Sequence, residues 1–264
     1  MDGETPLRLL VAWHPNASGN EALEFAAWLS RTTPTIVRTV TIVVRPWLAL
    51  SKLTSKYEKQ LAKEAHRACQ QAKKALTAAG VPEDSWDDPV NVLVDGSSQA
   101  ALLNDIATDF DASIILFGSQ GAARKGSFRA NSTVDALLHS SPYALGLTPR
   151  APKLAKHGVK RLTVAFTSLE FDSDTLDTAL GLAGRLDVPV RVLAILREDV
   201  DTPTSLQSEL HHSSREDALA FLDSLHDSIA DKHPEQTVEA ELAYGPSVAD
   251  AMETPRWKLS LIHI

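Results

Sequence analysis

The segment 118–133 holds the residue types in this chain that are best suited to chemistry. Gly118 and Gly121 stand near its start, it contains no Asp or Glu, and it carries three basic side chains, Arg124, Lys125 and Arg129. Glycines allow the backbone to approach an anion closely, and the free N–H groups at the start of a helix direct partial positive charge toward it. Because the whole chain has a formal net charge of -8, this local excess of positive charge favours a phosphate-binding loop.

A purely structural interpretation fits the end of the same segment. Ser132 is followed three residues later by Asp135, which is the spacing of a capping box at the start of a helix. A capping box requires no ligand, and the charge of Asp135 would disfavour a phosphate nearby. From the residues alone, an anion site and a structural turn both stay open.

Alternating strands and helices are predicted around this segment. Short apolar runs predict strands over 7–13, 36–44, 90–94, 113–117 and 145–147. Helical patterns predict a helix starting at the capping-box sequence 18–21 and further helices over 57–79 and 100–110. This alternation predicts a parallel sheet with right-handed crossovers and helices on both faces. Ligands bind at the carboxyl ends of such strands, which is where segment 118–133 begins.

The same order of elements is written twice. Leu9–Trp13 matches Leu162–Phe166, and Val92–Ser98 matches Ala240–Pro246. A repeat of about 150 residues is a duplicated domain, because solenoid units run only about 20–50 residues. The second copy predicts strands or helices over 162–166, 176–186, 188–196, 218–229 and 238–243. We therefore expect two α/β domains, 1–150 and 158–264, joined by a linker over 148–158.

The second copy stops before its own glycine loop, which would begin just beyond residue 264. Residues 259–264 form an apolar run that fits a truncated fourth strand. Alternatively, residues 258–264 are foreign and derive from sequencing read-through, the interpretation we favour. In both cases the strand 162–166 is expected to have an unpaired edge, which favours association with other chains.

Composition argues against several classes of protein. The acidic net charge argues against a binder of duplex nucleic acid or of an anionic membrane. Cys69 is the only cysteine, so an intramolecular disulfide and a cysteine-rich metal site are excluded. The pair His211–His212 lacks a third ligand at helical spacing, so we expect no metal.

No apolar run reaches about 18 residues, the length of a membrane-spanning helix, and the acidic start 1–4 is unlike a signal peptide. We expect a cytoplasmic protein.

The glycine loop and the doubled α/β pattern resemble the universal stress protein family. Its nucleotide-binding members carry Gly-x-x-Gly, nine residues, and then Gly followed by Ser or Thr. Gly118 and Gly121 match this motif, Asn131 stands in place of the third glycine, and Ser132, next to Thr133, stands where the family's hydroxyl contacts phosphate. The resemblance spans nearly the whole chain. It implies two tandem Rossmann-like domains of the adenine nucleotide alpha hydrolase type, with ATP as the ligand.

Two positions depart from the nucleotide-binding pattern. Asn tolerates left-handed backbone better than other non-glycine residues, so Asn131 can preserve the loop while its side chain intrudes on the phosphates. The first strand ends at His14, where nucleotide-binding members place an Asp, and Thr167 is the counterpart in the second copy. The resemblance also implies that Val43 or Val44 lines the adenine pocket. ATP binding therefore stays open.

Three classes of function follow from these observations. The leading hypothesis is a stress-response regulator without catalytic activity, either responsive to adenine nucleotide or acting as a nucleotide-independent scaffold. An ATP-using enzyme is the alternative, but the sequence after His14 lacks the second histidine of an adenylyltransferase signature, and the chain has no Walker or Gly-x-Ser-x-Gly pattern. A flavin or electron-transfer subunit is the third. Because family domains pair through their last strands, we also expect a homo-oligomer or pairing of the two domains within the chain.

Overall fold

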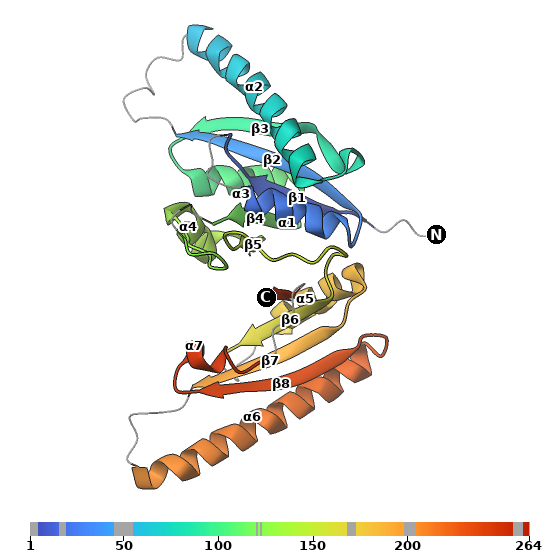
Figure 1. Ribbon diagram of the computed structural model, residues 1–264, viewed down its shortest axis with the longest axis vertical. Helices are drawn as coiled ribbons and strands as arrows, with labels where there is room; N and C mark the ends of the chain where they lie inside the picture. Colours follow the sequence, from blue (N-terminus) through green and yellow to red (C-terminus); the bar gives the residue numbers. More distant parts are fainter. Residues whose placement is uncertain are drawn as a thin grey trace. The chain divides into compact units, whose positions relative to one another are not determined.

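The computed structural model describes residues 5–15, 20–44, 55–119, 121, 123–167, 173–197, 204–255 and 261–263. The chain divides into two compact units, Met1–Gly158 and Val159–Ile264. In each unit, parallel strands form a sheet and helices connect them (Figure 1). The predicted α/β fold class is confirmed.

The first unit is built on a five-stranded parallel sheet with the order β3-β2-β1-β4-β5. Its strands are β1 (Leu7–Ala12), β2 (Thr35–Val44), β3 (Trp86–Gly96), β4 (Ile114–Gly118) and β5 (Ala144–Thr148). The central strand β1 is covered on both faces, which explains its unbroken apolar run. The chain adds β2 and β3 on one side of β1 and then crosses to add β4 on the other. A crevice forms at such a switch point, outside the carboxyl ends of the strands.

Among the described residues, four α-helices and one short 3-10 helix (Glu83–Ser85) connect these strands. Helices α1 (Glu21–Ser30) and α2 (Ser55–Ala79) pack against each other, as do α3 (Gln99–Phe110) and α4 (Ser132–Ser140). A buried cluster that includes Leu10, Leu103, Phe110, Ile115 and Val134 joins α3 and α4 to the sheet. This packing holds the starts of α3 and α4 beside the carboxyl ends of β1 and β4.

The predicted start of α1 is wrong. The capping-box pattern at 18–21 places the cap at Ser18, which lies outside the described residues, whereas the helix begins at Glu21 with Asn20 as its N-cap. The Asn20 side chain makes no capping hydrogen bond and instead accepts one from Trp13 Nε1 at 3.3 Å. A tertiary contact therefore replaces the local cap, and Glu21 becomes the first helical residue.

The second unit repeats the order of elements in a four-stranded parallel sheet, β8-β7-β6-β9. Its elements are β6 (Arg161–Phe166), α5 (Ser173–Leu186), β7 (Val190–Arg197), α6 (Thr204–Lys232), β8 (Val238–Gly245), α7 (Val248–Ala251) and β9 (Leu261–His263). Strand β9 pairs with Arg161–Thr163 of β6, as β4 pairs with β1 in the first unit. The expectation that β6 has an unpaired edge is therefore contradicted along these residues. None of the described helices in either unit has the length and apolar character to cross a membrane.

Candidate functional site

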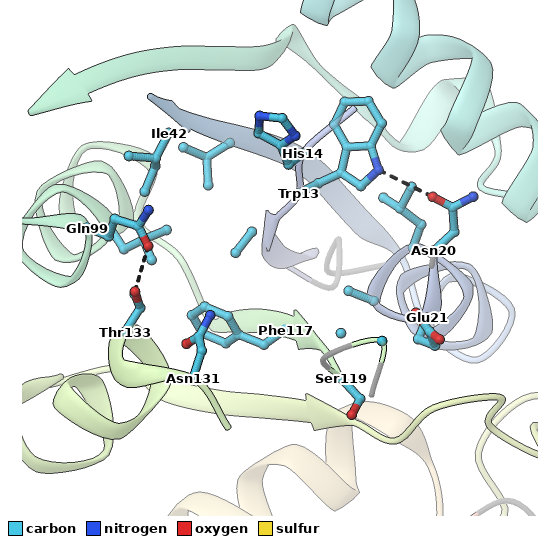
Figure 2. A pocket seen from close by; sticks show the side chains of 17 residues that line it. Trp13, His14, Asn20, Glu21, Ile42, Gln99, Phe117, Ser119, Asn131 and Thr133 are labelled. Atoms are coloured by element: carbon cyan, nitrogen blue, oxygen red, sulfur yellow. Dashed lines mark hydrogen bonds between the residues drawn. The ribbon is translucent and has the colours of Figure 1, made fainter. Parts of the chain in front are cut away.

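A cavity of about 510 Å³ lies at the carboxyl edge of the first sheet, at its switch point. Small-molecule pockets typically enclose about 300–1,000 Å³. The lining comes from the ends of β1, β2 and β4, the starts of α1, α3 and α4, and the loop after β4 (Figure 2). Of the residues proposed from sequence, the structure brings five together in this lining: His14, Gly118, Gly121, Asn131 and Thr133.

Two of the proposed residues, Val43 and Ser132, do not line the cavity. Successive side chains of a strand point to opposite faces. Val40 and Ile42 of β2 both face the cavity, so Val43 faces the other side of the sheet. The local sequence could not decide between Ile42 and Val43, because both are apolar residues near the end of the strand. Ser132 is exposed and is the first residue of α4.

The expected capping box of Ser132 and Asp135 is also wrong. Asn131 is the N-cap of α4, and its Oδ1 accepts a hydrogen bond from the Val134 backbone N–H at 2.9 Å. The φ of Asn131 is -104°, so its backbone is extended and needs no left-handed conformation. Asn131, which stands in place of the third glycine of the motif that the loop resembles, therefore acts as a helix cap. Its side chain takes up one of the helix N–H groups that an anion would otherwise receive.

The basic residues of the loop do not reach the cavity. Arg124, Lys125 and Arg129 are exposed, and none of them belongs to the described lining. Backbone hydrogen bonds tie this part of the loop elsewhere, since Gly126 N–H donates to Arg150 O at 2.8 Å. Gly126 has a φ of +79°, which glycine adopts without strain. The loop conformation thus turns the predicted positive charge toward solvent.

The cavity lining contains an acidic residue, Glu21. The sequence pattern predicted Glu21 as part of a helix start and not as a residue of the site. A Cβ atom built on Gly118 would lie 3.5 Å from Glu21 Oε2 and 3.5 Å from the Ala22 backbone nitrogen. The carboxylate therefore stands beside the glycine loop, where the resemblance places phosphates. No Lys or Arg appears among the described residues of the lining. This end of the cavity is consequently unfavourable for a polyphosphate.

The opposite side of the cavity is formed by apolar and uncharged polar groups. Thr133 Oγ1 donates a hydrogen bond of 2.6 Å to Gln99 Oε1, which joins the starts of α4 and α3. Figure 2 shows this pair across the cavity from Asn20 and Glu21. Apolar walls are contributed by Val40, Ile42, Leu103 and Phe117. Sequence reasoning missed Gln99, although its place directly after the Ser98 cap, at a strand's carboxyl end, could have indicated it.

The described residues contain no group of three or more His, Cys, Asp or Glu side chains that could hold a metal ion. The side chains of His211 and His212 lie outside the described residues. Cys69 is a free, partly buried cysteine on α2, away from the cavity lining.

Comparison with known proteins gives consistent matches. The model of the universal stress protein family matches residues 7–145. Universal stress proteins of Mycobacterium tuberculosis and Mycobacterium bovis are 29% identical to the chain over 192 residues, or 71% of the chain and 63% of each relative. The chain thus spans less than two thirds of the length of these curated relatives. A universal stress protein from Archaeoglobus fulgidus has a similar fold, with a TM-score of 0.60 at 14% identity, covering 93% of this chain and 80% of that one.

Proposed function

Because this chain belongs to the universal stress protein family, we propose that it is a stress-response regulator that acts by binding an adenine nucleotide or nucleoside in its first unit. One observation supports this most directly. The cavity lies at the switch point of the sheet, with Gly118, Gly121 and the start of α4 in its wall. Ligand binding there would change the packing of the loops at the sheet edge, and so the surface offered to a partner.

The distribution of polar groups indicates which part of the ligand contributes most to binding. Ile42, Leu103 and Phe117 provide apolar walls for a base, and the Gln99 amide can donate hydrogen bonds to it. The phosphate end is weakened because Asn131 already bonds the Val134 N–H and because the Glu21 carboxylate lies beside Gly118. We therefore expect adenosine and AMP to bind at least as tightly as ATP.

A thermal-shift titration with adenosine, AMP and ATP tests this function. A ligand at about one hundred times its Kd stabilises the native state by about 2.7 kcal/mol, which for a unit of this size raises its Tm by roughly 5–10 °C. Ile42→Trp fills the cavity and should abolish the shift. Val43→Trp is the matched control, because it places the same side chain on the opposite face of the same strand. If none of the three ligands shifts the wild-type Tm, the chain is a nucleotide-independent scaffold and the proposal fails.

Binding without catalysis is the second part of the proposal. Purified protein should release no phosphate from ATP above background. Turnover that is present in the wild type and in Val43→Trp but absent in Ile42→Trp would place a reaction in this cavity. That result would favour the alternative of an ATP-using enzyme.

A further inference from the structure

The helices α2 and α6 occupy equivalent places in the two units, each between the second and third strands, yet they carry opposite charge. Residues 55–79 of α2 include six Lys or Arg and two Asp or Glu. Residues 204–232 of α6 include two Lys or Arg and six Asp or Glu. The proposed ligand site uses neither helix, so this reversal of charge requires a separate explanation.

On α2 the positive charge is concentrated on the outward face. The buried side of the helix follows Ala68, Ala72 and Leu76. Lys59, Lys63 and Arg67 recur every four residues and are all exposed. At about 100° per residue these three lie on the side opposite the buried one. We call Lys59, Lys63 and Arg67 the basic stripe.

The outward face of α6 is its acidic counterpart. The side chains of Ala218, Leu222 and Ile229 are buried. Asp223, Asp227 and Asp231 recur every four residues, are exposed, and lie on the opposite side of the helix. We call Asp223, Asp227 and Asp231 the acidic stripe. Asp227 also has a neighbour on its own helix, since its Oδ1 lies 3.5 Å from His226 Nδ1.

The two stripes match when the helices run antiparallel. Both stripes have a spacing of four residues, so each spans about 12 Å along its helix axis. Lys59 then faces Asp231, Lys63 faces Asp227 and Arg67 faces Asp223. The same register brings a fourth outward pair together, Lys74 with Glu216. The charges are therefore complementary in position as well as in sign.

The net charges of the two units favour contact between a first unit and a second unit. Residues 1–158 contain 17 Lys or Arg and 15 Asp or Glu, whereas residues 159–264 contain 9 and 19. The first unit thus has a net charge of +2 and the second a net charge of -10. This asymmetry attracts the first unit of one copy to the second unit of another, although the chain as a whole is acidic.

We propose that α2 of one copy docks antiparallel on α6 of a second copy through the basic and acidic stripes. Single exposed ion pairs contribute little, so the contact depends on several pairs in one register. An interface that uses one helix from each copy is small, and small interfaces are typically weak and reversible. It is also weakened by salt, because both stripes are exposed to solvent.

Sedimentation velocity on the full chain, at about 20 mM and about 500 mM salt, tests the proposal. The wild type should self-associate at low salt and dissociate at high salt. Replacing Lys59, Lys63 and Arg67 by Glu should weaken self-association about tenfold or more, because three attractions become repulsions. Replacing Asp223, Asp227 and Asp231 by Lys should do the same. An equimolar mixture of these two triple variants should associate again, because each then carries a stripe that complements the other.

A matched control separates the stripe from net charge. Lys153, Lys156 and Lys160 are exposed and lie outside α2, so their replacement by Glu changes the charge equally but should leave association intact. Far-ultraviolet circular dichroism of each variant checks that it is folded. The proposal is overturned if the wild type is monomeric at low salt, if the mixture does not associate, or if the control loses association as well. Salt-dependent compaction at unchanged mass would indicate contact within one chain and would also overturn it.

Discussion

The cap of α4 offers the sharpest test of the site, because sequence and structure assign it to different residues. Asn131 Oδ1 accepts from the Val134 N–H at 2.9 Å. Replacing an N-cap Asn by Ala typically costs about 0.5–2 kcal/mol. For the first unit we therefore expect Asn131→Ala to lower the free energy of unfolding by about 1 kcal/mol and the Tm by roughly 2–4 °C. Asn131→Gly should cost only a few tenths of a kcal/mol, since Gly is a tolerated cap.

Chemical unfolding followed by tryptophan fluorescence measures this effect, because four of the five tryptophans lie in residues 1–158. Ser132→Ala is the matched control. Ser132 is the first helical residue and its side chain does not cap the helix, so its loss should change the free energy of unfolding by less than about 0.5 kcal/mol. If Ser132→Ala destabilised the unit more than Asn131→Ala, the helix would begin one residue later and the account of the site would be refuted.

Asn131→Gly also tests the role of the cap in ligand choice. Removing the side chain frees the Val134 N–H for a phosphate oxygen, and hydrogen bonds to charged groups contribute about 1.5–3 kcal/mol. We expect the affinity for ATP to rise about tenfold while the affinity for adenosine stays unchanged. Isothermal titration calorimetry with both ligands measures the difference. An equal change for both ligands would mean that Asn131 acts on the nucleoside that they share and not on the phosphates.

Three further predictions concern single side chains. Glu21→Gln should strengthen ATP binding about threefold to tenfold at low salt, because it removes the repulsion between the Glu21 carboxylate and phosphates beside Gly118. The control is Glu24→Gln, an exposed neighbour outside the cavity lining. Titration calorimetry should show no gain in ATP affinity for this control. Gly245→Ala should destabilise the second unit by about 1–3 kcal/mol, because its Cβ would lie 2.8 Å from the Ala251 backbone nitrogen. Gly181→Ala should stabilise the same unit by about 0.5–1 kcal/mol, since this position lies inside α5 with open space around it. Thermal unfolding measures the effect of both glycine substitutions. If Gly245→Ala and Gly181→Ala changed the Tm equally, the difference in space around the two glycines would be contradicted.

Much of the fold could be predicted from the order of the residues. Burial on both faces of a parallel strand requires an unbroken apolar run, and an amphipathic helix requires a repeat of about 3.6 residues. These local requirements are visible at Leu7–Ala12 and along Ser55–Ala79, and the structure has the predicted elements there. The duplication is visible for the same reason, since the strand at Arg161–Phe166 must meet the same demands as its counterpart. Periodicity thus establishes the class and order of elements.

The site depended on contacts that no local pattern records. Val43 and Ile42 are equally apolar, and only the pairing of β2 within the sheet determines that Ile42 faces the cavity. Asn131 and Ser132 are both good caps, and the choice depends on where α4 packs against α3. Glu21 lines the cavity because the start of α1 lies close to Gly118. Residue types and spacing therefore indicated which loop could bind a ligand, whereas the direction of each side chain, and with it the charge of the cavity, followed from packing between segments far apart in the chain.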